Sequence, residues 1–558
     1  MEKIFRIFSK EYGNINQAAL LLAMFALFSQ VLGLFRDRLI AHFIGPGQIL
    51  DIYYTAFRIP DLIFISVASL AGVAVMVPVL SAKMKDGITL EARKFLSDIF
   101  TVFFWALVIV SLLAFLLMPV LAPLVAPGFD DIALEKLVTM SRIMLLSPIL
   151  LGLSNLFGSI TQLYRKFFIF SLSPVLYNLG IIFGIVFLYP SIGLYGLALG
   201  VVLGAALHFV IQFFSSRGLG FQTGFSWKID WQSIRSTVLH SVPRTLGLSM
   251  NNLALISIVA MASFLKPGSI SIFNLSLNLQ SVPLNIIGIS YSVAAFPVLA
   301  RTFSSGASGE FREHLKKAAR AIVFWSIPIT FIFIVLRAQI VRVLLGSPSF
   351  SWENTRLVAA ALAIFSVSVL AQGMIALLSR AYYAKGNTRQ PLLVNLCSSI
   401  FIVLTAYWLI YIFQTSAFFR YFIESMLKVS DIPGTEVLML PLAYSFGTVL
   451  NFLIHWHLAK KEFMPGETFI SKTFFQSLGA SFFIGFVAYL SLNFFSPIFG
   501  TTTFWGVFFQ GFVSAALGGI AGICVLFLLK NEELSEIILA LSSRFWKAKI
   551  IQPPQEGL

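Results

Sequence analysis

Charged side chains inside apolar segments are the residues of this sequence that most clearly suggest a functional role. The first two long apolar segments contain six of them: Arg36, Asp37, Arg38, Asp51, Arg58 and Asp61. A charge at the centre of a bilayer costs about 2.5–3.5 kcal/mol on insertion scales, so charges that remain there indicate a functional site. The planar guanidinium group of arginine matches phosphate oxygens with paired hydrogen bonds. The pattern therefore indicates an anionic guest, such as a phosphate.

Two of these arginines are the strongest candidates for a cavity. Arg36 follows the helix-breaking Gly33, and Arg58 precedes Pro60. Both lie deep in their apolar segments, where a guanidinium needs a polar partner. We expect them to line a central cavity and to contact the phosphate groups of the guest.

Three further arginines fit either a cavity or the membrane surface. Arg38 and Arg142 lie where a long side chain can extend to the membrane interface, and Arg244 follows Pro243 near the start of another apolar segment. Arg38 and Arg244 stay candidates for substrate binding. From the fourth predicted helix onwards no acidic residue lies inside a predicted span, so the sequence does not favour a cation antiporter.

Helix-breaking residues occur at corresponding places in two predicted helices. Such residues kink helices and make them pliable, as a rocking bundle requires. Together with Gly33 we therefore predict these hinge positions: Pro60, Gly72 and Pro78 in the second predicted helix, and Pro283, Gly288 and Pro297 in the eighth.

The composition predicts that lipid surrounds these elements. Of the 558 residues, 58% are hydrophobic and only 11% are charged, and the mean hydropathy is +0.89. A soluble domain is roughly a quarter charged, which excludes an ordinary cytosolic enzyme. Intervals without charge predict an all-α polytopic membrane protein with fourteen transmembrane helices, at residues 15–41, 53–82, 98–122, 137–161, 168–188, 194–215, 238–264, 270–299, 319–336, 357–383, 391–412, 437–458, 474–494 and 504–529.

The distribution of basic residues orients these helices. With the N-terminus in the cytoplasm, 27 of the 39 lysines and arginines fall in cytoplasmic segments and seven fall in the opposite loops. This asymmetry follows the positive-inside rule, so we expect both termini in the cytoplasm. The net charge of +15 then reflects loops that face an anionic leaflet rather than nucleic acid.

The sequence resembles itself at an offset near 220 residues. The segment AVMVPVLSAKMKDG, ending at Gly87, is similar to VAAFPVLARTFSSG, ending at Gly306. Each repeat holds six predicted helices, so both copies have the same orientation, as in alternating-access transporters. We expect these domains: an amphipathic lead-in 1–16, an N-lobe 17–215, a cytoplasmic linker 216–237, a C-lobe 238–458 with an extracytoplasmic insertion at 413–436, two further helices within 459–529, and a cytoplasmic tail 530–558.

Signatures of catalysis are absent from the sequence. It contains no Walker loop, no HExxH motif and no dinucleotide fingerprint, and its two cysteines and six histidines make no metal-ligand pattern beyond the weak pair His455 and His457. We therefore predict neither enzymatic activity nor a cofactor or metal ion.

Residues 31–62, VLGLFRDRLIAHFIGPGQILDIYYTAFRIPDL, resemble the start of the MurJ (MviN) family of lipid II flippases, in the multidrug/oligosaccharidyl-lipid/polysaccharide (MOP) superfamily. The similarity continues through VPVLSAKM at 77–84, APGF at 126–129 and PVLYNLGII at 174–182. The resemblance implies a lipid II flippase of the cytoplasmic membrane that moves the undecaprenyl-pyrophosphate-linked peptidoglycan precursor for cell-wall synthesis. It also implies two lobes around a cationic cavity, a groove for the lipid tail between the last two helices, and function-linked charges at Arg36, Asp51 and Arg58.

The sequence departs from the family pattern at several positions. Gln30 and Asn278 stand where the family has basic residues, and both are candidates for the substrate site. The missing arginines leave open a flippase for another polyprenyl-pyrophosphate-linked glycan, or a non-transporting protein that keeps the fold. The expected partners are a lipid-linked anionic glycan and membrane lipids, without nucleic acid, and we expect a monomer.

Overall fold

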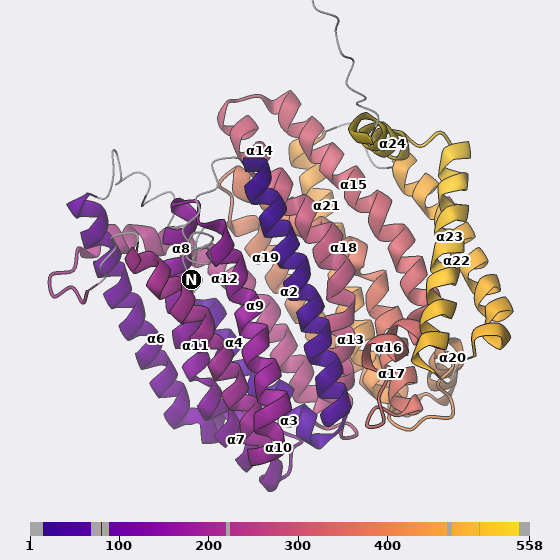
Figure 1. Ribbon diagram of the computed structural model, residues 1–558, viewed down its shortest axis with the longest axis horizontal. Helices are drawn as coiled ribbons and strands as arrows, with labels where there is room; N and C mark the ends of the chain where they lie inside the picture. Colours follow the sequence, from indigo (N-terminus) through magenta and orange to yellow (C-terminus); the bar gives the residue numbers. More distant parts are fainter. Residues whose placement is uncertain are drawn as a thin grey trace, which may run out of the picture. The chain divides into compact units, whose positions relative to one another are not determined.

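Helices build this protein in a computed structural model, which describes residues 15–67, 80, 89–218, 224–465, 471–500 and 503–545 (Figure 1). Within these residues the only β pairing is one isolated bridge between Ser347 and Phe350. The prediction of an all-α fold is confirmed.

The described residues of the first half of the chain form a series of helices. They are α2 (Ile15–Phe43), α3 (Gln48–Ala56), α4 (Arg58–Val67), α6 (Leu90–Val125), α7 (Asp131–Met144), α8 (Leu146–Leu163), α9 (Phe167–Phe183), the π-helical turn η2 (Gly184–Leu188), α10 (Tyr189–Ile192), α11 (Leu194–Gly218) and α12 (Trp231–Ala262).

The second half continues in the same way. It contains α13 (Ser269–Pro283), the π-helical turn η3 (Leu284–Ile289), α14 (Ser290–Ser304), α15 (Ser308–Val335), α16 (Arg337–Leu345), α17 (Trp352–Val367), α18 (Val369–Ala384), α19 (Arg389–Thr415), α20 (Ala417–Leu427), the 3₁₀ turn η4 (Thr435–Leu438), α21 (Met439–Phe463), α22 (Ser471–Phe499), α23 (Phe504–Leu528) and α24 (Glu532–Phe545).

Many of these helices suit a membrane. Among the described residues, eleven are long and apolar enough to cross one, and twelve if Trp352–Ser366 and Val369–Ala384, bent by 43°, count as one span. Neither of the first two predicted spans is among them, and part of 53–82 lies outside the described residues. The number fourteen therefore stays a prediction.

Two predicted helices are each broken four residues before a proline. The helix α3 ends at Ala56, four residues before Pro60, and α7 ends at Met144, four residues before Pro148. A proline has no N–H to donate to the carbonyl four residues earlier, and its ring clashes with that carbonyl. Each proline consequently lies in the first turn of the helix that follows the break.

Several helices extend beyond the predicted intervals. The helix α6 starts at Leu90 rather than at 98, because the side chain of Thr89 accepts a hydrogen bond from the N–H of Ala92 at 3.1 Å and caps it. The helix α15 starts at Ser308 rather than at 319. Intervals without charge mark the lipid-facing core of a helix, whereas capping residues set its ends.

The helices group into two compact units, called the first and second unit below. The first contains the residues up to Leu279 with Leu344–Phe365 and Asn387–Asn451, and the second contains Gln280–Val343, Ser366–Gly386 and the residues from Phe452 onwards. Each has its own buried apolar cluster, around Phe157 in the first and around Tyr382 in the second. The lobes 17–215 and 238–458 stay a prediction.

Glycines on α11 pack closely against α9 and the π-helical turn η2 inside the first unit. A Cβ atom on Gly200 would lie 2.6 Å from the Cα of Gly184, and one on Gly204 would lie 2.4 Å from the carbonyl oxygen of Tyr177. The sequence predicts this close packing from glycines spaced by four at 196, 200 and 204. The structure confirms it.

Two segments for which the sequence predicts no transmembrane helix each contain a helix. The insertion 413–436 includes α20, and the C-terminal tail 530–558 includes α24. The predicted lead-in lies almost wholly outside the described residues, which begin at Ile15.

Candidate functional site

Arg36 and Asp37 lie at the centre of a polar network in the first unit. The Nε and Nη2 atoms of Arg36 donate to Asp37 Oδ1 at 3.0 and 2.9 Å, and its Nη1 donates to Asn178 Oδ1 on α9 at 3.2 Å. Asn278 Nδ2 on α13 donates to the other carboxylate oxygen of Asp37 at 3.1 Å. Two charges and two amides thus join α2, α9 and α13 inside an apolar bundle.

The amide of Asn178 is itself held in place. Its Nδ2 donates to Ser29 Oγ at 3.2 Å and to the carbonyl oxygen of Pro174 at 3.2 Å, so its oxygen is directed to Arg36. Arg36 lies seven residues before the end of α2, about 10 Å along the axis at 1.5 Å per residue. Its side chain is 23% exposed. The guanidinium is therefore oriented and still accessible.

Arg58 is supported in a similar way from α13. Its Nη2 donates to Asn274 Oδ1, and Asn274 Nδ2 donates to the carbonyl oxygen of Ile270 at 2.7 Å. The Nε of Arg58 and the hydroxyl of Tyr54, one helical turn earlier, are buried and have no hydrogen-bond partner among the described residues. Buried polar groups normally have partners, so these two groups are unsatisfied in this conformation.

Asp51 binds the start of α13. The N–H of Gly268 donates to its Oδ2 at 2.6 Å, and the N–H and hydroxyl of Ser271 donate to its Oδ1 at 2.7 and 2.5 Å. A carboxylate at this position satisfies helix-end amides and is favoured by the helix dipole. Asp51 is 3% exposed. These contacts support a role in holding α3 to α13.

Other contacts close the same end of the first unit. Ser347 Oγ donates to the carbonyl oxygen of Ala41 at 3.1 Å, and the N–H of Gly128 donates to Ser263 Oγ at 2.9 Å. Gly45 has a φ of +71°, and a Cβ on it would lie 2.3 Å from the carbonyl oxygen of Ser349. Ala41, Gly45 and Gly128, like Asp51, therefore contact residues beyond 260.

The structure brings together some of the predicted site residues. It joins Arg36 with Asn278 through Asp37. Gln30 and Arg38 are partly buried on α2. The side chain of Arg244, and Gly72 and Pro78, lie outside the described residues.

The predicted hinge residues have varied surroundings. Pro60 follows the break between α3 and α4, and Pro283 directly precedes the π-helical turn η3. Gly288 lies in that turn, where a Cβ atom would lie 2.5 Å from the Cα of Gly373, so close packing also requires a glycine there. Pro297 is exposed within α14, and a Cβ on Gly33 would meet no atom within 4 Å. Hinge motion at these positions stays a prediction.

The sequence did not single out two asparagines and one aspartate that make contacts in the first unit. Asn178 and Asn274 orient the arginines, and the only available signal was an amide inside an apolar segment. Asp98 on α6 is 1% exposed, and its Oδ2 accepts the N–H of Asp230 at 3.0 Å. It therefore ties the segment before α12 to α6.

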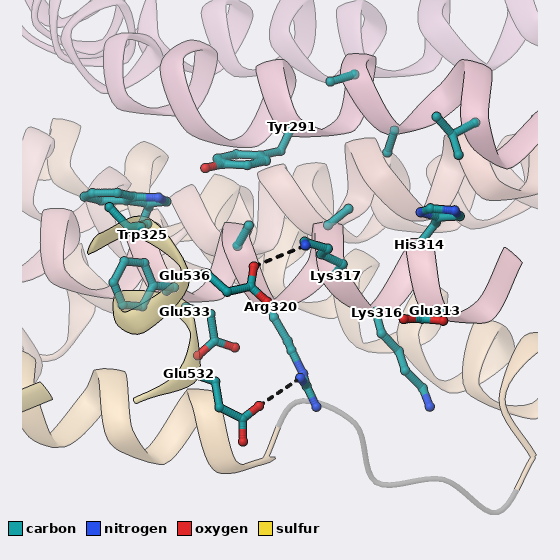
Figure 2. A pocket seen from close by; sticks show the side chains of 17 residues that line it. Tyr291, Glu313, His314, Lys316, Lys317, Arg320, Trp325, Glu532, Glu533 and Glu536 are labelled. Carbon is teal, nitrogen blue, oxygen red and sulfur yellow. Dashed lines mark hydrogen bonds and ion pairs between the residues drawn. The ribbon is translucent and has the colours of Figure 1, made fainter. Parts of the chain in front are cut away.

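A cavity of about 670 Å³ lies in the second unit, between α14, α15 and α24 (Figure 2). Tyr291 and Trp325 line it, and two ion pairs bridge α15 and α24 across it, Lys317 to Glu536 at 3.1 Å and Arg320 to Glu532 at 3.5 Å. Cations and carboxylates line it in similar numbers, so they largely neutralise one another. The cavity does not match the cationic cavity that the family resemblance implies.

No group of three or more His, Cys, Asp or Glu side chains that could hold a metal ion occurs in the described part of the chain. Cys397 and Cys524 are both free and exposed.

Comparison with known proteins gives a consistent result. The pattern of the family described as lipid II flippase MurJ matches residues 40–510. A lipid II flippase MurJ from Burkholderia cenocepacia is 28% identical over 399 residues, which are 70% of this chain and 77% of that protein.

Solved structures of transporters have the same fold. The structure of lipid II flippase MurJ in an inward closed conformation matches with a TM-score of 0.72 at 20% identity, covering 93% of this chain and all of that one. An inward-facing multidrug resistance MATE family transporter of the MOP superfamily matches with a TM-score of 0.62 at 13% identity, covering 80% of this chain and 98% of that one. The predicted MOP-like architecture is confirmed.

Proposed function

This chain belongs to the lipid II flippase MurJ family, and we propose that it carries lipid II across the bacterial cytoplasmic membrane by alternating access. The match over residues 40–510 carries the proposal. Transport of this kind breaks no covalent bond, so the protein needs binding groups and a gate rather than catalytic residues.

Arg36 and Arg58 are the proposed ligands of the substrate pyrophosphate. The amides of Asn178 and Asn274 each orient one guanidinium. Each amide occupies a single nitrogen, and the Nε of Arg58 and the Tyr54 hydroxyl remain as donors. Guanidinium groups held in this way lose little side-chain freedom when phosphate oxygens bind.

Asp51 is the proposed latch of the extracytoplasmic gate. In this conformation its carboxylate holds α3 to the start of α13, while the surrounding contacts close the same end. The substrate then enters from the cytoplasmic side. For the extracytoplasmic side to open, Asp51 must release the amides of α13. These amides then become exposed to water.

The membrane potential is the proposed driving force. The pyrophosphate is anionic, and a charge that crosses the membrane gains or loses about 2.3 kcal/mol per 100 mV. A potential that is negative inside therefore drives the headgroup outwards. With Asp37 bound to Arg36 and Asp51 bound to α13, neither carboxylate is free to couple an ion in this conformation.

Complementation tests the function directly. The wild-type gene should restore growth to cells depleted of their own lipid II flippase, whereas Arg36→Ala and Arg58→Ala should not restore it at equal expression. Arg142→Ala is the matched control, because Arg142 contacts the ring and carbonyl oxygen of Phe115 instead of this network. Wild-type growth with both test variants would contradict the assigned site.

A reconstituted assay separates the possible cargoes. Proteoliposomes with wild-type protein should expose labelled lipid II on the opposite leaflet faster than protein-free vesicles do. If another polyprenyl-pyrophosphate-linked glycan crosses and lipid II does not, then the cargo assignment is wrong and the transport assignment stands. If neither crosses, the protein does not transport.

A further inference from the structure

The helix α20 within the insertion 413–436 is attached to the first unit through one face. Ile423 and Leu427 are buried. The ring of Phe413 on α19 packs edge-on against Phe419, with centroids 6.4 Å apart, and Thr435 Oγ1 donates to Glu424 Oε1 at 2.6 Å. The orientation of α20 on the unit is therefore fixed.

The segment after α20 is attached as well. Arg356 on α17 donates two hydrogen bonds to the carboxylate of Asp431, at 2.7 and 2.6 Å, and a further one to the carbonyl oxygen of Lys428. Lys428 ends the helix in the left-handed conformation, with a φ of 61°. Side chains on the outer face of α20 thus have constant surroundings.

The outer face of α20 is strongly apolar. Phe418, Tyr421, Phe422 and Met426 are 82%, 68%, 54% and 56% exposed. Their spacing of i, i+3, i+4 and i+8 puts them on one side of a helix, opposite the buried Ile423 and Leu427. A patch of large apolar side chains on a protein surface indicates an interaction site.

A stripe on the neighbouring α19 indicates what covers this face. Leu404, Tyr407, Trp408 and Tyr411 are 64%, 71%, 58% and 59% exposed and follow the spacing i, i+3, i+4, i+7. They lie on a span long and apolar enough to cross the membrane, Arg389–Thr415. Tyrosine and tryptophan at the end of a span are typical of the lipid headgroup level.

The distance along the chain puts α20 at the same level. Five residues separate Tyr411 from Ser416, where the backbone becomes extended before α20 begins. Five helical residues rise about 7.5 Å, which is similar to the thickness of one polar interface of a bilayer, about 5–8 Å. The helix α20 thus starts about one interface thickness beyond the exposed aromatic stripe of α19.

One basic side chain lies on the side of α20 away from the apolar face, and another follows the end of the helix. Arg420 and Lys428 are exposed, and Glu424, the one acidic residue of α20, accepts the hydrogen bond from Thr435. A helix with aromatic residues on one face and basic residues away from that face is typical of binding in the headgroup layer.

We propose that α20 is an interfacial helix, whose aromatic face inserts into the outer leaflet of the membrane at the boundary between headgroups and acyl chains. Its occupant is lipid, because the face follows within a few residues the exposed aromatic stripe of α19, a span long and apolar enough to cross the membrane. The helix keeps the joined ends of α19, α20 and α17 at one depth in the membrane.

Spin labels in liposomes test this proposal. In a background with Cys397→Ser and Cys524→Ser, single cysteines replace Phe418, Phe422 and, as a control on another side of α20, Arg420. Collision rates with oxygen, which concentrates in lipid, and with a water-soluble nickel chelate then report depth. We expect a ratio of oxygen to nickel collisions at least fivefold higher at 418 and 422 than at 420.

Each other result overturns the proposal. If all three labels collide with nickel equally, then the aromatic face lies in water. If the labels at 418 and 422 are shielded from both reagents, then a protein surface covers this face. Because all three positions are exposed in the structure, we expect the labelled variants to fold, and a single symmetric elution peak for each confirms it.

Discussion

Weakening the contact between Asp51 and α13 should shift the protein away from the conformation described above. The substitution Asp51→Asn keeps the size of the side chain but removes its charge. The new NH2 group is a donor, and it would face N–H or O–H groups that are donors as well. Ser271→Ala removes only the hydroxyl donor and leaves both backbone amides bound. Ser276→Ala is the matched control, because that hydroxyl bonds only to carbonyl oxygens of its own helix.

The magnitude follows from the three hydrogen bonds. A hydrogen bond to a charged group contributes about 1.5–3 kcal/mol, so Ser271→Ala should shift the ratio of closed to open protein about tenfold to a hundredfold. Asp51→Asn loses at least two such bonds, about 3 kcal/mol or more, and the shift should exceed a hundredfold. Ser276→Ala should leave the ratio within about threefold of the wild-type value, which corresponds to ~0.6 kcal/mol.

Distances between two spin labels measure this ratio. Labels at Ile49 and Phe264, both exposed near Asp51, should show one short distance in the wild type without substrate and an additional longer distance in Asp51→Asn. Ser271→Ala should give an intermediate share of the longer distance. If Asp51→Asn gives the wild-type distribution both with and without lipid II, then the carboxylate does not hold this end closed.

Three further results are expected. Asn178→Leu removes the amide acceptor of the arginine network, so the flipping rate at low lipid II density should fall about tenfold, by ~1.4 kcal/mol, whereas an unchanged rate would show that the amide has no orienting role. Arg356 holds the pKa of the Asp431 carboxyl below its usual range through hydrogen bonds. The difference in Tm between wild type and Asp431→Asn should therefore be largest near pH 7 and shrink as the pH falls below about 4; a difference as large at pH 3 as at pH 7 would contradict this. Gly200→Leu forces a side chain against backbone, which costs about 1–3 kcal/mol or more, and thermal unfolding in detergent should show a lower Tm.

The sequence predicts the apolar cores of the helices better than their ends or breaks. Charge is costly in lipid, so charge-free intervals locate the spans. The start of α6 depends instead on the cap at Thr89, outside its interval. The break before Pro148 depends on one backbone carbonyl. Such local features carry little hydropathy, and the intervals therefore missed them.

The sequence predicts which residues belong to the candidate site, but it does not predict which residues they contact. Arg36 and Arg58 were recognisable because isolated charges in apolar segments are rare. Their amide partners are 142 and 216 residues away in sequence, and an asparagine in an apolar helix has no pattern that names its neighbour. Asp51 shows the same limit, since its type indicates a charged role but only the packing of α3 on α13 reveals that it binds helix-end amides.

The glycine contact between α9 and α11 has a consequence for measurement. Contacts between side chains can adjust by changing rotamers, but this contact brings backbone against backbone at Gly180 and Gly204. It has no rotamers to change, so the two helices must keep one separation through any transport cycle. A pair of probes on α9 and α11 should give the same distance in every condition. This pair is therefore an internal ruler against which movement of the neighbouring helices can be calibrated.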